Sequence, residues 1–397
     1  MDMTTRDEAQ TQPGALDLLS EAGIAVWVEL FYDLIYVAAM LIFSAAVETV
    51  RPQSGVSWIV ASFAAAWWIW FATTACANRF HSSDLLHRLL LLFQMLVIVL
   101  MAMEARVSVV GDSTWLAGEY GLLLLTVAVM YWRAGRAGGD QAGIAMTLTK
   151  INVVAAVFFL VAPAVSESAR LVLCVVGMAV AVLPSMVAWH RIGSFSDHAE
   201  GHFVERMAAF TLIVCGEAFI EVALRVSGPK IVRLDLVSLV YEFLLTFAMF
   251  SLYFRDVTVA GLQQRRFGWW AFWHLVMLIG IAGTAIGSSL LVSLDPSHHI
   301  PNVEIIKLTG SLVLFFVGLA GIGCCGRRTP QGGLLRLRLA TAGVIALIGV
   351  VAWTVPWIHL GEALPAFLVV TVGCVVASGR LRASTSVLPA EEFLARR

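Results

Sequence analysis

Charged residues are scarce in this sequence. Asp, Glu, Lys and Arg make up 13% of its 397 residues, whereas 59% are hydrophobic. A soluble globular chain is about a quarter charged, and its core cannot absorb so large a share of apolar side chains. The formal net charge of −1 also gives no support for a nucleic-acid partner. The composition therefore predicts an integral membrane protein that contacts the lipid bilayer and binds no nucleic acid.

The motifs of common soluble enzymes are missing as well. The six cysteines form no CxxC pair and no zinc spacing, and there is no GxSxG elbow, phosphate-binding glycine loop or dinucleotide fingerprint. His198, His202 and Glu205 share one helical face that is able to bind a metal, but they lack the HExxH arrangement. We therefore expect no cofactor and no metal. Residues 1–23 are polar and lack the basic and apolar regions of a signal peptide, so we expect the first apolar segment to remain.

What the sequence has in abundance is long apolar runs. A membrane-spanning helix needs about 20 mostly apolar residues, and twelve segments approach that length. The sequence thus predicts an all-α, polytopic transmembrane helix bundle of about twelve spans. A kink at Pro356 in place of the last turn would leave eleven. The predicted spans lie near 24–47, 57–78, 86–109, 115–132, 143–164, 170–189, 204–225, 235–254, 268–292, 303–325, 338–358 and 362–379.

The positive charges predict the orientation of the chain. Loops on the cytoplasmic side of a membrane retain Lys and Arg. With the predicted spans, 18 such residues fall on the side of the N-terminus and 7 on the opposite side, leaving out Lys150, which lies within a span. We therefore expect both termini in the cytoplasm.

A weak internal repeat suggests two halves. Glu29 and Glu205 each follow a valine at the start of a predicted span, and Arg79 and Arg255 each end one; both pairs are 176 residues apart (205 − 29 and 255 − 79). Duplicated halves are common in transporters. The repeat predicts a cytoplasmic tail over 1–23, six-helix halves over 24–190 and 191–379, and a second cytoplasmic tail over 380–397.

Acidic residues inside the apolar runs are the informative feature. Glu29 and Asp33 share one face of the first span, and Glu217 and Glu221 lie deep in the seventh. Two central acids cost roughly 5–7 kcal/mol on the membrane-insertion scale, and eight residues of the Leu, Ile, Phe or Val type return only roughly 2.4–4.8 kcal/mol. The acids therefore need a partner, a proton or a wet cavity. Candidate partners in the neighbouring spans include Thr73, Thr74, His87, Gln94, Glu104, Lys150, Asn152, Glu242 and His274.

We predict that the central substrate or proton network comprises eight residues drawn from several spans. Arginines near the cytoplasmic side are expected to neutralise Glu29 and Glu205. A purely structural role, with ion pairs that fix helix register, is the competing interpretation. The eight residues are Glu29, Asp33, Asn78, Arg79, Arg88, Glu205, Arg206 and Glu217.

Several of these residues stand in a known pattern. The segment 29–37, ELFYDLIYV, resembles the ELFFDLVFV signature of the bacterial low temperature requirement protein A (LtrA) family. The stretch 202–217 is similar to that family's H-x-x-E-R and L-G-E elements, with Cys215 where Leu is usual. Asn78-Arg79, His87-Arg88, Tyr253-Phe254 and His274-Leu275 also fit, whereas Arg255 stands where Asp is expected. The resemblance covers about 27–290 and implies a bacterial multipass membrane protein without implying a substrate.

Three functions are compatible with these features. A solute transporter agrees with the two predicted halves and the buried acids, and its partner would be a small solute or a proton. We favour this function over an enzyme. A membrane-embedded lipid-modifying enzyme is less favoured because no predicted loop exceeds about 20 residues, a length too short for a sizeable catalytic loop. A non-catalytic envelope protein supporting growth in the cold is the third.

Overall fold

The structure, a computed structural model, consists of helices throughout the residues that it describes. These are 27–39, 42, 55–80, 84–107, 114–139, 141–191, 197–226, 233–260, 266–292, 302–326, 332–355, 358 and 360–386. Residues 27–39 are helical, and we refer to them as the N-terminal helix segment. The predicted tail over 1–23 lies outside the described residues. The other helices are α2 (Gly55–Phe80), α3 (Leu85–Val107), α4 (Thr114–Arg136), α5 (Ala142–Val161), the short 3₁₀ turn η2 (Ala162–Ala164), α6 (Glu167–Arg191), α7 (Asp197–Val226), α8 (Arg233–Ala260), α9 (Phe267–Val292), α10 (Asn302–Cys324), α11 (Gly332–Thr354) and α12 (Leu360–Ser386).

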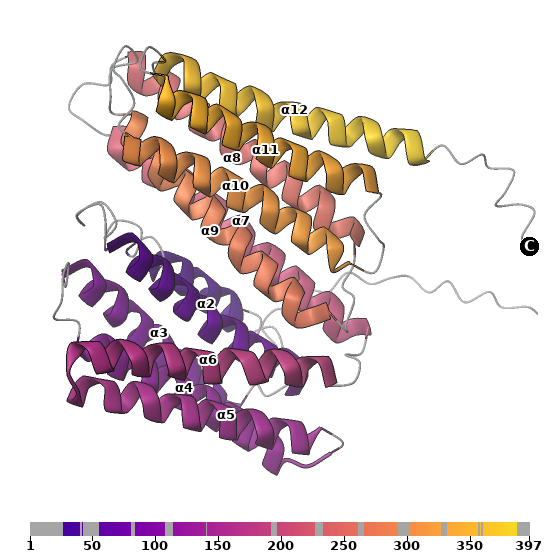
Figure 1. Cartoon of the computed structure of the whole chain (residues 1–397). Helices are drawn as coiled ribbons and strands as arrows, with labels where there is room; N and C mark the ends of the chain where they lie inside the picture. The colour runs from indigo at the N-terminus through magenta and orange to yellow at the C-terminus, as the bar shows by residue number, and fades with distance from the viewer. Residues whose placement is uncertain are drawn as a thin grey trace, which may run out of the picture.

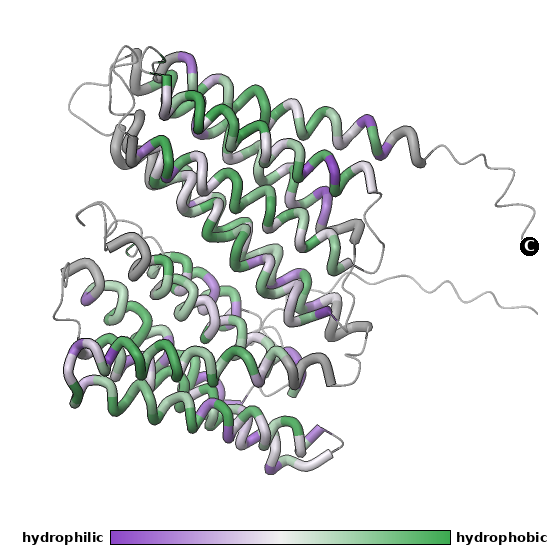
Figure 2. Tube along the Cα trace, viewed as in Figure 1, coloured by the Kyte–Doolittle hydropathy of each residue, from purple (hydrophilic) through white to green (hydrophobic). Residues whose placement is uncertain are grey.

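Eight of the described helices are long and apolar enough to cross a membrane: α3, α4, α5 with η2, α6, and α9 to α12. Figure 2 shows hydrophobic residues along most of their length, with hydrophilic residues gathered mainly toward the helix ends. This supports the predicted membrane bundle. The count of twelve spans stays a prediction, because the described parts of α2, α7, α8 and the N-terminal helix segment do not meet the same criterion.

The last two helices are separate elements. α11 ends at Thr354, α12 begins at Leu360, and the two pack against each other. Pro356 lies outside the described residues, so the choice between eleven and twelve spans stays a prediction. α12 continues to Ser386, seven residues beyond the predicted span end at 379, so the first part of the predicted tail over 380–397 is helical. Residues 387–397 lie outside the described residues.

The helices gather in two groups. α2 to α6 lie on one side of the molecule and α7 to α12 on the other (Figure 1). α7 and α9 carry the contacts between the groups, since α7 packs against α2, and α9 packs against α2 and α6. The predicted halves over 24–190 and 191–379 and the internal repeat stay predictions.

Glycine sets the tightest helix contact, between α9 and α10. A Cβ atom on Gly318 of α10 would lie 2.6 Å from the backbone nitrogen of Met277 on α9. Gly280 and Gly287 of α9 face the backbone of α10 in the same way. Small residues let helix backbones approach closely in a membrane, where van der Waals packing replaces the hydrophobic effect as the driving force.

Candidate functional site

Arg206 of α7 forms a buried ion cluster with the N-terminal helix segment. Its Nη2 atom lies 2.5 Å from Asp33 Oδ1, and its Nη1 atom lies 3.3 Å from Glu29 Oε2. The Asp33 side chain is fully buried, the Arg206 side chain is 8% exposed and the Glu29 side chain 22%. The helix repeat explains the convergence: Glu29 and Asp33 are four residues apart and so face the same neighbour. The sequence predicts that the acids of the first span need a partner. Arg206 is the partner of both Glu29 and Asp33.

Trp70 of α2 completes the cluster. Its indole Nε1–H donates to Asp33 Oδ1 over 2.7 Å, so this one oxygen accepts from both Trp70 and Arg206. Asp33 Oδ2 and Arg206 Nε are buried and have no hydrogen-bond partner among the described residues. The cluster therefore joins the N-terminal helix segment, α2 and α7. Its unused hydrogen-bonding atoms are one acceptor, on Asp33, and one donor, on Arg206.

Gln94 of α3 organises a polar network beside Asp33. Its Oε1 accepts hydrogen bonds from Tyr32, at 2.6 Å, and Thr73, at 3.0 Å. Its Nε2 donates to Thr126 of α4 over 2.7 Å. Tyr32 precedes Asp33 directly, so the Gln94 network fixes the N-terminal helix segment against α2, α3 and α4.

Asn78 and His202 connect the same two groups about one helical turn from Arg206. His202 Nδ1 lies 3.2 Å from Asn78 Oδ1, between α7 and α2. His202 and Arg206 are four residues apart and so lie on one face of α7. His87 of α3 lies close enough to Glu29 and Arg206 to interact with their charges. Histidines thus flank the ion cluster, and His202 pairs with an amide. Among the described residues no group of three or more His, Cys, Asp or Glu side chains gathers as a metal site would require.

The remaining predicted site residues do not join Arg206. Arg79 donates to the side chain of Gln141. Arg88 is half-buried, and Glu205 is exposed with no described cation at ion-pair distance, so the expected neutralisation of Glu205 is not seen. Glu217 is half-buried and its Oε2 atom is enclosed without a described partner. Eleven residues separate Glu217 from Arg206, a rise of about 16 Å, which places Glu217 too far along α7 to touch the ion cluster.

Two other predicted partners lie on α8 and α9 and make hydrogen bonds of their own. His274 of α9 is fully buried, with Nδ1 2.8 Å from the Trp270 carbonyl oxygen and Nε2 3.3 Å from the Tyr253 hydroxyl of α8. Glu242 of α8 is also fully buried and contacts Thr246 at 3.4 Å. His274 therefore acts as a hydrogen-bonded core residue.

Sequence reasoning missed a second charged cluster at the ends of α8, α11 and α12. Arg338 of α11 pairs bidentately with Asp256 of α8, with nitrogen–oxygen distances of 3.1 and 3.2 Å, and its Nη1 donates to Ser378 and Cys374 over 2.8 Å. Arg382 also contacts Asp256. In the sequence, Arg338 and Arg382 counted only as positive charges on the cytoplasmic side, and Asp256 was not singled out. Arg338 stands at the start of a predicted span, and this position was the signal in the sequence that it needs an acidic partner. Arg255 stands where the family pattern has an aspartate, and the next residue in this chain is Asp256. The acid is thus present one residue later.

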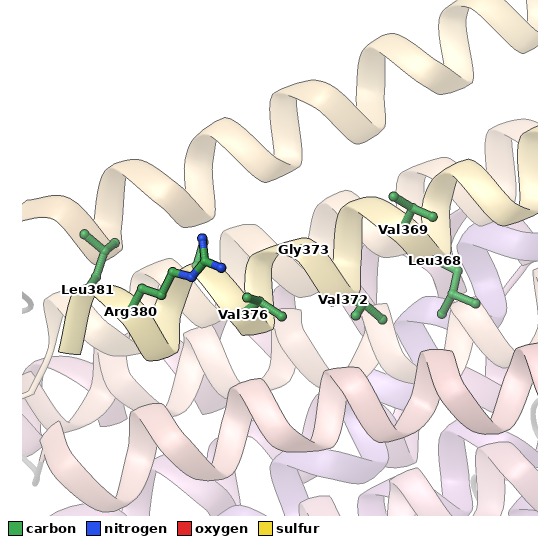
Figure 3. A pocket seen from close by; sticks show the side chains of 8 residues that line it. Leu368, Val369, Val372, Gly373, Val376, Arg380 and Leu381 are labelled. Atoms are coloured by element: carbon green, nitrogen blue, oxygen red, sulfur yellow. The ribbon is translucent and has the colours of Figure 1, made fainter. Parts of the chain in front are cut away.

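A groove runs along α12, away from both the Arg206 cluster and the Gln94 network. Its volume is about 820 Å³. Figure 3 shows its lining of valine and leucine side chains with Arg380 near one end. Leu368, Val369, Val372, Gly373, Val376, Ala377, Arg380 and Leu381 line it.

Apolar helices in two groups, joined by a buried ion cluster, define a multipass helical membrane protein. Residues 25–378 match the family model described as "Bacterial low temperature requirement A protein (LtrA)". The chain belongs to this family. It is also similar to an uncharacterized protein of Rhizobium meliloti (strain 1021), RA0937, with 24% identity over 339 residues that cover 79% of this chain and 81% of that protein. No solved structure matches the chain.

Proposed function

We propose that this protein carries protons, or a small cationic solute coupled to them, across the bacterial cytoplasmic membrane. In this proposal the chain has about twelve spans, with both termini in the cytoplasm. The observation that carries the proposal is the Glu29–Asp33–Arg206 cluster, which lies where the first described helix meets α7. In transporters built from two halves the binding site lies between them.

The composition of the cluster supports a binding role over a purely structural one. Two carboxylates share one guanidinium, so the cluster carries a net charge of −1 if both are ionised. One acid would suffice to neutralise Arg206. The second acid, together with the unused Asp33 Oδ2 and Arg206 Nε atoms, offers a place for a proton or a cation.

The other residues predicted from the sequence take supporting positions in this proposal. Asn78 and His202, about one turn from Arg206, extend the polar path along α7. Arg79, Arg88 and Glu205 form its cytoplasmic entrance. Glu217 lies further along α7 and serves as a second carboxylate toward the opposite side, separated from the Arg206 cluster by apolar packing.

Glu29→Gln is the sharpest test, because it removes the second acid and leaves the Arg206–Asp33 pair intact. Purified protein is placed in proteoliposomes loaded with a pH-sensitive dye, and a membrane potential is imposed. We expect proton entry with the wild type, a loss of at least about tenfold with Glu29→Gln, as a general acid–base group contributes, and wild-type entry with Asp84→Asn, an acid outside the cluster. Equal proton entry with Glu29→Gln and the wild type contradicts the proposal.

The family description offers a second readout that needs no known substrate. The description names a low temperature requirement. A deletion strain that grows poorly in the cold would be complemented by the wild type and by Asp84→Asn but not by Glu29→Gln. Full complementation by a Glu29→Gln protein would favour the non-catalytic envelope role instead.

A further inference from the structure

The groove on α12 is almost entirely apolar and opens outward. Val369, Val372 and Val376 line it and are 68%, 39% and 50% exposed. In a membrane protein such a surface faces the acyl chains of the bilayer. All eight lining residues belong to α12, so an acyl chain in the groove lies along one face of this helix and gains van der Waals contacts with its valines and leucines.

Arginine marks one end of the groove. Arg380 lines it, and the Arg380 side chain extends from α12 beyond the row of valines in Figure 3. A guanidinium nitrogen of Arg255 lies 3.6 Å from the place of a Cβ atom on Gly379, the residue before Arg380. The Arg255 side chain of α8 therefore lies against α12 at the residue that precedes Arg380. Both arginines are exposed.

The local charge balance leaves these two arginines uncompensated. Asp256 is the one acid within residues 251–260, 332–340 and 374–386, and it already pairs with Arg338 and Arg382. Among the described residues no carboxylate lies at ion-pair distance from Arg255 or Arg380. The end of the groove therefore carries a positive charge that Asp256 does not neutralise.

We propose that this groove is a binding site for an anionic phospholipid. One acyl chain lies along Val369, Val372 and Val376, and the headgroup phosphate lies between Arg255 and Arg380. Guanidinium groups suit phosphate because they donate two parallel hydrogen bonds to its oxygens. Basic pockets at the membrane interface bind acidic headgroups for the same reason. The site is independent of the Arg206 cluster, so either proposal can fail alone.

The test compares phosphatidylglycerol with phosphatidylcholine of the same acyl chains, added to the full-length protein in detergent and measured by native mass spectrometry. We expect tighter binding of phosphatidylglycerol to the wild type and a loss of about 5-fold for each of Arg255→Gln and Arg380→Gln. Val372→Trp, which fills the groove without changing charge, should weaken binding of both lipids. Arg136→Gln is the matched control, since Arg136 is an exposed arginine at the end of α4 that lies over Trp132.

Three results would overturn the site. The first is equal binding of the two lipids by the wild type. The second is an unchanged preference for phosphatidylglycerol in the Arg255→Gln/Arg380→Gln double variant, which would place the headgroup elsewhere. The third is an equal loss with Arg136→Gln, which would indicate general attraction to positive charge. Thermal unfolding in phosphatidylcholine micelles checks that each variant remains folded.

Discussion

The Nη2 atom of Arg206 lies 2.5 Å from Asp33 Oδ1, although 173 residues separate the two in the chain. This contact joins the N-terminal helix segment to α7, so it holds together the two groups of helices. It also places a guanidinium and a carboxylate where neither is solvated. Their mutual attraction and the hydrogen bond from Trp70 must therefore offset the cost of removing both charges from water.

Removing one partner of this pair should destabilise the protein strongly. Arg206→Gln leaves Asp33 as an uncompensated buried charge, which costs about 3–5 kcal/mol in buried pairs, whereas Asp33→Asn leaves Arg206 paired with Glu29 and should cost less. Thermal unfolding in detergent measures the effect. The double variant should be more stable than Arg206→Gln alone, since Asp33 no longer lies fully buried without a cation. Additive losses in the double variant would show that Asp33 and Arg206 do not interact.

The Gln94 network should contribute to stability through hydrogen bonds that have no replacement. Gln94→Leu deprives the buried Tyr32 and Thr73 hydroxyls of their acceptor. Each buried polar group left unsatisfied costs about 1–3 kcal/mol, so we expect a clear drop in unfolding temperature. Thr147→Ala, which removes an exposed hydroxyl bonded only within its own helix, should have little effect. A Gln94→Leu protein as stable as the wild type would contradict these assigned contacts.

The contact between α9 and α10 predicts a steric effect at Gly318. Gly318→Leu places a side chain against the backbone of Met277, which cannot move aside within a packed helix. Overpacking of this kind costs about 1–3 kcal/mol or more. Gly343→Leu on α11 is the matched control, since a Cβ atom there meets nothing within 4 Å. Similar unfolding temperatures for the two variants would mean that α9 and α10 do not approach as closely as described.

Asp84 at the start of α3 predicts a pH dependence. Burial alone raises its pKa, but hydrogen bonds from Arg133, at 2.5 Å, and from the His87 backbone N–H, at 3.2 Å, outweigh this and lower the pKa overall. A lowered pKa in the folded state means that the stabilisation is complete above the ordinary value of 3.8 and is lost as the pH falls through the folded value.

The comparison of wild type with Asp84→Asn at several pH values measures this effect. An asparagine retains the helix cap, so the difference comes from the ion pair with Arg133; Asp84 is 53% exposed, and such a pair contributes about 0.2–1 kcal/mol at neutral pH. The difference should shrink below pH ~4, where the aspartate becomes protonated. A difference in stability between wild type and Asp84→Asn that grows as the pH falls would contradict the lowered pKa of Asp84.

The sequence predicted the helical class and the need of Asp33 for a partner, because hydropathy and the cost of a buried charge are local properties. Which partner it would find depended on packing. Arg206 was one of several arginines near the cytoplasmic side. It pairs with the acids because Glu29 and Asp33 lie on the helix face that packs against α7. The hydrogen bond from Trp70 to Asp33 was not predicted. A tryptophan among apolar residues has the same sequence pattern whether its indole only packs or also donates a hydrogen bond.

Asp256 and Arg338 were missed for a related reason. The charge count used Arg338 only to orient the chain and did not consider Asp256. α11 begins at Gly332 and α8 continues to Ala260, so both residues lie on helices and pair with each other. Glu205 was expected to be neutralised by arginines near the cytoplasmic side, but its side chain is exposed and no described cation lies at ion-pair distance from it. The orientation of the chain and the internal repeat rest on the sequence and stay predictions.

The Asp33→Asn/Arg206→Gln double variant, assayed for proton entry in proteoliposomes at a temperature where it is folded, tests the central claim most directly. The variant keeps a neutral, hydrogen-bonded pair in place of the buried ions and so separates structural support from binding. We predict a folded protein whose proton entry falls to the level of protein-free liposomes. A folded double variant that admits protons at the wild-type rate would show that the cluster only holds the helices together.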